Sequence, residues 1–302
     1  MILFYYATME GLAKKIAEDE KIFLGKISWG LFPDGMPNTF IKDVCVDVEG
    51  RDVAFLASFD DPAEIFRQLS VIYALPRYDS KSFRVILPYF PGTMERVERE
   101  GEVATAMTLV RMFNAVECEK VPLYIFDIHD KHERFYFRHP IIPRLKSAIP
   151  LLTDRLSVLD DKTAKTVCFP DEGAYKRFGH AFDERHDKIL CHKERFGDKR
   201  KVKIIEGSPK GKHVIIVDDL VMTGGTLLEC AKALERKGAK SVSAYATHAV
   251  FPNKSYFNMN KFPFANFWVT DSCPETIKGF KDCKTKFEVL SLAPSIAKIL
   301  LS

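Results

Sequence analysis

One stretch in the second half of the chain combines residue types that suit a phosphate-binding site. Residues 214–217 are apolar and β-favouring, and two adjacent carboxylates, Asp218 and Asp219, follow them. The sequence Thr-Gly-Gly-Thr then precedes a helix-like run at 227–236. A buried strand, a glycine turn and a helix start form an anion site, because the helix N-terminus presents unpaired N–H groups and glycine lets the backbone approach the ligand. The residues that would hold the phosphate are Thr223, Gly224, Gly225 and Thr226.

The two carboxylates narrow the choice of ligand. A carboxylate beside a phosphate is repulsive unless it faces a donor or a cation, and sugar hydroxyls or a bridging metal ion would both serve. The stretch therefore predicts a phosphorylated sugar, with its phosphate on the loop and its hydroxyls on Asp218 and Asp219. The alternative is an ordinary strand–turn–helix in which the acids only end the strand. The combination of strand, acids, glycines and helix favours the binding site.

Similar polar clusters follow other predicted strands. Strands and helices alternate along the chain, which predicts an α/β fold of mainly parallel sheets flanked by helices, formed twice. In such folds, ligands bind at the carboxyl ends of the strands. We therefore expect the clusters at these ends to line one shared cleft. The clusters are Asp127 with His129, Asp171 with Glu172, Lys193 with Arg195, and Asp218 with Asp219.

Two of these clusters offer groups that suit phosphate oxygens. The sequence at 171–174 presents consecutive backbone N–H groups, and Asp171 would also reach a metal ion; a plain strand-to-helix turn is the alternative. Lys193 and Arg195 belong to an alternately charged run, which is either a basic flap over a polyphosphate or a solvated surface. The residues of the first loop are Asp171, Glu172, Gly173 and Ala174.

Candidate residues in the first half of the chain have functional and structural interpretations. His129 is a candidate metal ligand or acid–base group, or a structural histidine. Phe32 and Asp34 occupy a turn, where they would stack on and bond to a base or pack within the loop. The charged stretch at 95–100 either binds a ligand or begins a solvated helix.

Composition limits the class of protein. The 302 residues suggest about two domains, with a boundary near 145–153. The net charge of +4 is too small to indicate nucleic-acid binding. Seven scattered cysteines without a CxxC pair indicate reduced thiols in a reducing compartment. We expect no signal peptide or membrane span. Among local elements, we expect a strand at 40–48 and a basic, non-strand segment from 192 onward.

Together these segments resemble the ribose-phosphate diphosphokinase, or phosphoribosyl pyrophosphate (PRPP) synthetase, family over nearly the whole chain. VIIVDDLVMTGGT is similar to the family's ribose-5-phosphate motif, FPDEGA to its pyrophosphate loop and HKER to its flexible catalytic loop. FDIH resembles the segment with its metal-binding histidine, and LPYFP…ER its ATP-binding segment. DIHDKHERFYF, ERVEREGEVATA and FWVTDSC are most similar to the plant-type, phosphate-independent branch. The family usually has a Glu near Met36 and Arg-Gln-Asp where this chain has Arg-Val-Glu at 96–98.

The resemblance implies two tandem phosphoribosyltransferase-like lobes. Residues 1–148 would form the ATP side and 149–302 the ribose-5-phosphate side, with the last helix packing back on the N-terminal lobe. The implied reaction transfers the diphosphoryl group of MgATP to the C1 hydroxyl of ribose 5-phosphate, which serves nucleotide biosynthesis. It also implies a cytoplasmic homo-oligomer with the ATP site near a subunit interface, Mg²⁺ as cofactor, and neither nucleic acid nor membrane as partner.

The resemblance assigns roles to the residues singled out above. Asp218 and Asp219 would hold the ribose hydroxyls, Thr223 to Thr226 the 5-phosphate, and Asp171 to Ala174 the pyrophosphoryl oxygens. His129 and Asp171 would contact Mg²⁺, and Lys193 and Arg195 would stabilise the transition state. The residues that would contact ATP are Phe32, Asp34, Arg96 and Glu98.

Two other functions share parts of this pattern. A phosphoribosyltransferase that consumes PRPP would carry a similar acidic motif, but it would not need a second α/β lobe. A regulatory subunit of PRPP-synthetase type would bind ligands without turnover, and such a subunit should have lost catalytic groups. This chain keeps Lys193, Arg195, Asp171 and His129 along with both aspartates, which favours an enzyme.

Overall fold

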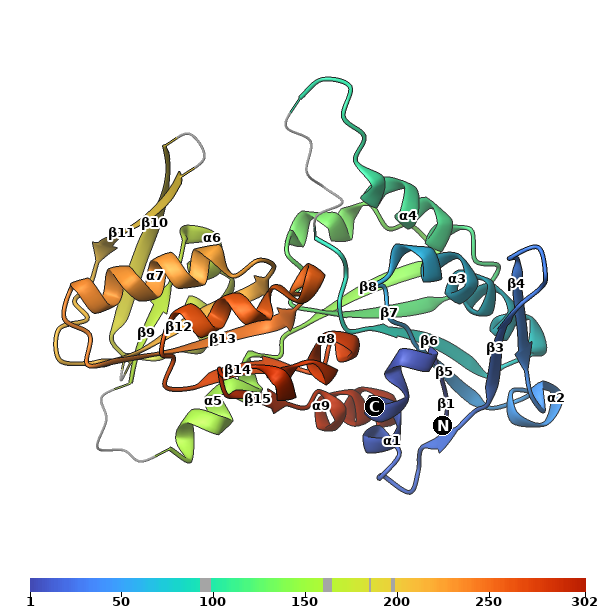
Figure 1. The fold of residues 1–302 in the computed structure, drawn as a ribbon. Coiled ribbons are helices and arrows are strands. Elements are labelled where there is room, and N and C mark those ends of the chain that lie inside the picture. Colours follow the sequence, from blue (N-terminus) through green and yellow to red (C-terminus); the bar gives the residue numbers. More distant parts are fainter. Residues whose placement is uncertain (93–98, 160–164, 185, 197–198) are drawn as a thin grey trace. The chain divides into compact units, whose positions relative to one another are not determined.

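The computed structural model describes residues 1–92, 99–159, 165–184, 186–196 and 199–302, with the backbone alone at 165, 193–196 and 199–201. This part of the chain divides into two compact units (Figure 1). The N-terminal unit comprises Met1–Lys146 together with the last residues, Leu292–Ser302. The C-terminal unit comprises Ser147–Ser291.

A six-stranded sheet forms the centre of the N-terminal unit. Its order is β2-β1-β5-β6-β7-β8, and each neighbouring pair is parallel. Its strands are β1 (Ile2–Tyr5), β2 (Phe23–Leu24), β5 (Asp52–Leu56), β6 (Ser82–Leu87), β7 (Val121–Phe126) and β8 (Ile141–Lys146). Its helices are α1 (Glu10–Ile16), α2 (Val44–Asp47), α3 (Ile65–Ala74), α4 (Thr105–Asn114) and α9 (Ala293–Leu301). A separate hairpin consists of β3 (Ile27–Leu31) and β4 (Pro37–Ile41).

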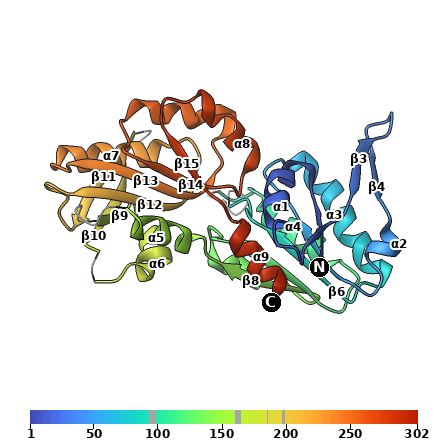
Figure 2. The same ribbon diagram turned by 90° about the horizontal axis from the view of Figure 1, so that it is seen from below.

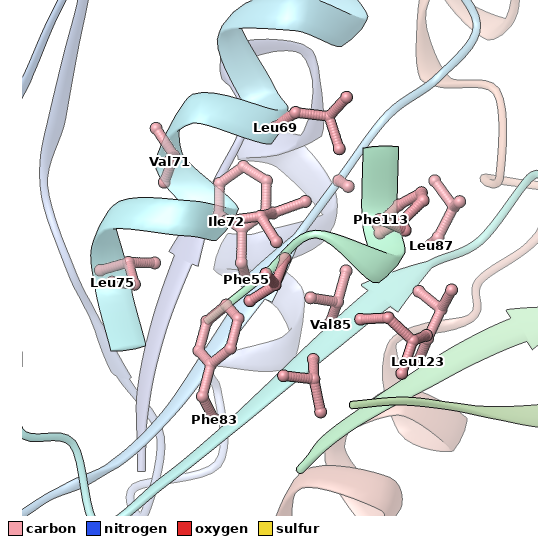
Figure 3. Packing of buried hydrophobic residues seen from close by; sticks show 14 of the residues in the cluster. Phe55, Leu69, Val71, Ile72, Leu75, Phe83, Val85, Leu87, Phe113 and Leu123 are labelled. Carbon is pink, nitrogen blue, oxygen red and sulfur yellow. The ribbon is translucent and has the colours of Figure 1, made fainter. Parts of the chain in front are cut away.

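One face of this sheet packs against α3 and α4 (Figure 3). Leu69 and Ile72 lie three residues apart on α3, so both point to the same side of the helix. They join Phe113 of α4 and the strand residues Phe55 and Val85 in one buried apolar cluster. Burying each such side chain contributes about 1.5–3 kcal/mol, so this packing holds the strand ends of the unit in place.

The last helix, α9, returns to the N-terminal unit. It contacts α1, and both helices bury apolar residues, including Leu12 of α1 and Ile296 of α9. The guanidinium of Arg84 on β6 donates a hydrogen bond to the carbonyl of Ile299, 3.1 Å away. The chain therefore enters the C-terminal unit and comes back before it ends (Figure 2).

A seven-stranded sheet forms the centre of the C-terminal unit. The order is β11-β10-β9-β12-β13-β14-β15, and all neighbours are parallel except the antiparallel pair β10 and β11. The strands are β9 (Lys165–Phe169), β10 (Lys188–Phe196), β11 (Lys199–Glu206), β12 (His213–Val221), β13 (Ser241–Ala249), β14 (Phe267–Thr270) and β15 (Phe287–Leu290). The helices are α5 (Ile149–Ser157), α6 (Glu172–Phe178), α7 (Gly225–Arg236), α8 (Pro274–Lys278) and the 3₁₀ segment η6 (Pro252–Lys261).

The two faces of this sheet carry different helices. Ile215 and Val217 of β12 point to the face covered by α5 and α6, where they share a buried cluster with Phe178. Val214 and Ile216 point to the opposite face and belong to the cluster that α7 and η6 cover. Because side chains alternate along a strand, both faces of β12 are buried and the strand reads as a continuous apolar run.

The predicted α/β class, with parallel sheets flanked by helices, is confirmed. Two local predictions are wrong. Residues 40–48 do not form one strand, since β4 ends at Ile41 and α2 occupies Val44–Asp47. The run after Cys191 is strand rather than a basic non-strand segment, because β10 continues to Phe196 and pairs with β11. β11 is the sheet edge, where charged residues are common in strands.

No helix in the described ranges is long and apolar enough to cross a membrane.

Candidate active site

The strand order of the C-terminal unit changes direction between β9 and β12. From β9 the chain crosses through α6 to β10 on one side, and from β12 it crosses through α7 to β13 on the other side. The two helices cover opposite faces of the sheet. The carboxyl ends of β9 and β12 therefore border a topological switch point, the place where open α/β sheets bind their ligands. The predicted loops at 171–174 and 223–226 both begin at this point.

The loop before α7 has an uncapped helix start. Gly224 is the N-cap residue, with φ of +77°, and glycine has no side chain to accept from the first N–H groups of the helix. Its carbonyl accepts from the N–H of Leu228 at 3.0 Å, so the N–H groups at 225–227 have no partner within the helix. This loop presents donors and the positive end of a three-turn helix dipole to a ligand.

Side chains of η6 hold this loop in place through hydrogen bonds to its backbone. The amide of Asn258 donates to the carbonyl of Thr223 at 3.2 Å, and the hydroxyl of Ser255 donates to the carbonyl of Met222 at 3.0 Å. A Cβ atom at Gly224 would lie 1.9 Å from Cε of Met259. The positive φ favours glycine at 224, and any larger residue would also have to displace the end of the Met259 side chain.

Asp218 and Asp219 point to opposite faces of β12. Asp219 follows Ile215 and Val217 in the alternation, so it faces α6, and its carboxylate forms an ion pair with the guanidinium of Arg177. Asp218 faces the side of α7, and its Oδ1 accepts from the backbone N–H of Asp219 at 3.0 Å. Both acids are buried, with 8% of Asp218 and 1% of Asp219 exposed, so Asp218 is the more accessible acid.

The loop before α6 is capped by its own residue. Asp171 is the N-cap, and its Oδ1 accepts from the backbone N–H of Ala174 at 2.8 Å. Glu172 is exposed and forms an i,i+4 ion pair with Lys176, with 3.7 Å between the charged atoms. The backbone of 171–174 is where the sequence predicts it, at the carboxyl end of β9, but part of its donor capacity is already used.

The strand pair β10 and β11 carries the predicted basic residues. Lys193 pairs in register with Val202, and Arg195 pairs with Arg200. The side chains of Lys193 and Arg195 lie outside the described part of the chain. Both residues lie beyond residues 188–190, which are the part of β10 that pairs with β9.

The N-terminal unit contains the other predicted residues. His129 is exposed and follows β7, and a Cβ atom at Gly92 would lie 2.6 Å from its Cβ. Phe32 and Asp34 lie in the turn of the β3–β4 hairpin, where half of Phe32 is exposed and Asp34 Oδ1 accepts from the N–H of Met36 at 3.0 Å. Arg96 and Glu98 lie outside the described residues.

The sequence interpretation did not identify Arg177, Asn258 or Ser255. Arg177 lies more than 40 positions from Asp219, and only the packing of α6 on the odd-numbered face of β12 brings the two together. Asn258 and Ser255 lie in a 3₁₀ segment without a recognisable motif. The sequence offers one signal for Arg177, which is a basic residue in the helix that follows the loop at 171–174. Without the strand order, this signal does not identify Asp219 as its partner.

Comparison with known proteins identifies the family. Residues 1–116 match the model for the N-terminal domain of ribose phosphate pyrophosphokinase, and residues 188–281 match the phosphoribosyl transferase domain. Ribose-phosphate pyrophosphokinase 4 of Arabidopsis thaliana is 49% identical over 309 residues, which cover 99% of this chain and 91% of that protein. Ribose-phosphate pyrophosphokinase 3, mitochondrial, of Spinacia oleracea is 48% identical and covers 99% of this chain and 76% of that protein.

A solved structure shares the fold over both units. The phosphoribosylpyrophosphate synthetase of Mycobacterium smegmatis superposes with a TM-score of 0.82 at 23% identity, covering 99% of this chain and 97% of that chain. The chain belongs to the ribose-phosphate pyrophosphokinase family. The resemblance stated from the sequence and the fold it implied are confirmed.

Proposed function

We propose that this chain transfers the diphosphoryl group of MgATP to the anomeric hydroxyl of ribose 5-phosphate, giving 5-phosphoribosyl 1-diphosphate and AMP. Membership of the family along 99% of the chain carries the proposal. The uncapped Gly224 loop supports it independently, since it follows two acids at the switch point of the sheet. We assign ATP to the lobe at 1–148 and ribose 5-phosphate to the lobe at 149–302.

The 5-phosphate is proposed to bind the loop at 223–226. The N–H groups at the start of α7 donate to its oxygens, and the hydroxyls of Thr223 and Thr226 add two donors. The ribose hydroxyls donate to the carboxylates of Asp218 and Asp219. Arg177 fixes the Asp219 carboxylate in its orientation, so the acid is placed before the sugar arrives.

In the reaction, a bond forms between the C1 oxygen of the sugar and the β-phosphorus. The bond between that phosphorus and the α–β bridging oxygen breaks, AMP leaves, and the hydroxyl proton is lost to solvent. Such transfers depend on positioning and on charge neutralisation more than on covalent catalysis. We assign the charge neutralisation to Lys193 and Arg195, and binding of pyrophosphoryl oxygens to the loop of Asp171 to Ala174.

We propose that Asp171 and His129 each contact Mg²⁺. Mg²⁺ takes one or two carboxylates and completes its shell with phosphate oxygens and waters. Asp171 fits this role because its carboxylate is only partly buried, at the carboxyl end of β9. When bound, Mg²⁺ would neutralise charge on the phosphate oxygens. For ATP itself we propose contacts from Phe32, Asp34, Arg96 and Glu98.

The reaction is tested by incubating the purified protein with ribose 5-phosphate and MgATP and measuring AMP and PRPP. We expect equal amounts of the two products without added inorganic phosphate, as in the plant-type branch. Parallel assays with GTP and CTP in place of ATP show which nucleotide donates the diphosphoryl group. A protein that consumes PRPP, or one without turnover, would contradict the proposal.

The role proposed for Lys193 is tested by Lys193→Ala. Loss of electrostatic stabilisation of the transition state should lower kcat by about 10²–10⁴-fold. Lys203→Ala is the matched control, since Lys203 is an exposed lysine on the paired strand β11. Full kcat in Lys193→Ala would show that Lys193 does not stabilise the transition state.

Oligomeric state and location complete the proposal. We propose a cytoplasmic homo-oligomer with its ATP site near a subunit interface. Its seven cysteines are free thiols, which suits a reducing compartment. Light scattering of the purified chain and fractionation of the source cells test the two statements separately.

A further inference from the structure

Three buried cysteines converge beneath the proposed active site. They come from three elements: Cys168 from β9, Cys191 from β10 and Cys230 from α7. The Sγ atoms of Cys168 and Cys191 are 3.6 Å apart, those of Cys168 and Cys230 are 3.7 Å apart, and those of Cys191 and Cys230 are 3.9 Å apart. All three side chains are fully buried. The sulfur atoms therefore form a nearly equilateral triangle.

The size of this triangle fits a metal ion rather than a disulfide. A disulfide requires about 2.05 Å between sulfur atoms, which is far shorter than any side of the triangle. With metal–sulfur bonds of about 2.3 Å, three ligands around one ion lie about 4.0 Å apart if the site is planar and about 3.8 Å apart if it is tetrahedral. The observed separations need only slight adjustment to reach either value.

The surroundings select a soft ion. The triangle lies in an apolar cluster with Ile189, Ile216 and Leu227. The carboxylate of Asp218, which acts on Cys230, would not alone supply the oxygen shell that a hard cation such as Mg²⁺ requires. Thiolate ligands favour soft ions, such as Cu(I) and Zn²⁺. Structural zinc usually takes four ligands, and within the described ranges the cluster supplies three, which favours Cu(I).

The three thiols differ in the direction of their pKa shifts. Hydrogen bonds from the two neighbouring S–H groups lower the pKa of Cys191, whereas burial raises the pKa of Cys168. A metal ion binds cysteine as the thiolate, so each thiol that binds the ion releases one proton to solvent.

We propose that Cys168, Cys191 and Cys230 form a binding site for one soft metal ion, with Cu(I) in three-coordinate sulfur ligation as the expected occupant. Each ligand lies close in sequence to a predicted functional segment. Cys168 is three residues before Asp171, Cys191 two before Lys193, and Cys230 one and a half turns after Gly224. A bound ion would therefore join β9, β10 and α7 directly. The proposal rests on the cysteines alone and does not depend on the reaction proposed above.

The stoichiometry of the full chain tests the site. The reduced protein is titrated without oxygen with Cu(I) held by a competing chelator, and Zn²⁺ and Mg²⁺ are titrated in separate arms. We expect one equivalent of Cu(I) to be retained, three sulfur neighbours in X-ray absorption, and no retention of Mg²⁺. Failure to retain a full equivalent of either Cu(I) or Zn²⁺ would overturn the proposal whatever the variants show.

Variants locate the bound ion. Cys168→Ala, Cys191→Ala and Cys230→Ala should each weaken Cu(I) binding by at least about tenfold and should lose the rise in unfolding temperature that the ion produces in the parent protein. Cys273→Ala is the matched control, because Cys273 is equally buried but lies outside the triangle. Circular dichroism of the metal-free variants confirms that they fold. Equal Cu(I) binding in the parent and the three variants would place the ion elsewhere and refute the site.

Discussion

The loops before α6 and α7 leave the same edge of one sheet but begin their helices in opposite ways. In the first, the Asp171 carboxylate accepts from the N–H of Ala174 at 2.8 Å, so the chain caps its own helix. In the second, Gly224 occupies the N-cap position, and no side chain of that residue can do the same. Both helices start at the switch point between β9 and β12.

This difference separates two ways of binding phosphate. The α7 loop keeps its N–H groups for a ligand and can hold an anion by itself. The α6 loop has already used one donor on a carboxylate, and that negative charge repels an anion unless a cation lies between them. We infer that the α7 loop suits the permanent 5-phosphate of a sugar, while the α6 loop suits a pyrophosphoryl group that arrives with Mg²⁺.

The largest expected effect on stability comes from the ion pair that connects the two halves of this comparison. Arg177 belongs to the helix after the capped loop, and Asp219 to the strand before the uncapped loop. Arg177→Met removes the guanidinium and leaves a buried carboxylate without this partner. Breaking a buried pair in this way should lower the free energy of unfolding by about 3 kcal/mol, measured by urea titration.

The double variant Arg177→Met with Asp219→Asn is the control for that measurement. It removes both charges, so most of the lost stability should return. If the single variant cost less than about 1 kcal/mol, the pair would be no stronger than an exposed one, and the proposed fixing of Asp219 would be wrong.

The next effect is on the uncapped loop itself. Gly224→Ala places a Cβ atom against Met259 and forces a non-glycine residue to adopt a φ of +77°. Displacement of the loop should lower kcat/KM for ribose 5-phosphate by about 10²-fold, or about 2.7 kcal/mol. Steady-state kinetics with saturating MgATP give the value.

Substitution of a second glycine shows whether the loss comes from contact with Met259 or from backbone strain alone. Gly211 has a similar φ of +72°, but a Cβ atom there would meet nothing within 4 Å. Gly211→Ala should lower stability slightly and leave kcat/KM unchanged. Equal kinetic losses in the two variants would show that the effect on the loop is not local.

Features that depend on neighbouring residues can be predicted from the sequence, whereas features that depend on distant residues cannot. The apolar run at 214–217 predicts a buried strand because each of its residues is β-favouring, and the glycines predict a turn because few other residues tolerate that backbone. These are properties of neighbouring residues. The charges of β10 and β11 do not predict the hairpin, because it is the pairing of the two strands that determines it.

The contacts between residues far apart in the chain cannot be predicted from the spacing of those residues in the sequence. The cysteines at 168, 191 and 230 are scattered along the sequence, and in the structure their thiols are free. Only the order of β9, β10 and β12 and the side on which α7 packs bring them within 3.9 Å. The pairing of Arg177 with Asp219 has the same origin, since it depends on which face α6 covers.

A smaller effect should separate the cap of α6 from its proposed role in binding metal. Asp171→Ala removes the N-cap acceptor and should lower the free energy of unfolding by about 1 kcal/mol. Asp171→Asn keeps an acceptor of similar strength and should leave stability nearly unchanged. Because the amide carries no charge, this variant should still need more Mg²⁺ for half-maximal activity. An unchanged Mg²⁺ requirement would make the residue a cap and nothing more.

The smallest expected effect lies at the other end of β12, away from both loops. His213 begins the strand, and its ring nitrogens lie 2.5 Å from Oγ of Ser241 and 3.2 Å from Oγ of Ser243. Burial lowers the pKa of His213, so the folded protein binds this proton less readily than the unfolded chain does. Its contribution is therefore fully present above about pH 6.5, the ordinary histidine pKa, and is lost as the pH falls toward the lowered value.

His213→Gln should flatten the loss of stability between about pH 8 and about pH 5, which bracket that pKa. His180→Gln, at an exposed histidine, should leave the profile as it is. KM for ribose 5-phosphate should not change in either variant, because His213 begins β12 whereas Asp218 and the loop at 223–226 lie at its other end. A shift in KM caused by His213→Gln would mean that the strand transmits changes to its acidic end, and the two loops could then no longer be treated as independent of the rest of the sheet.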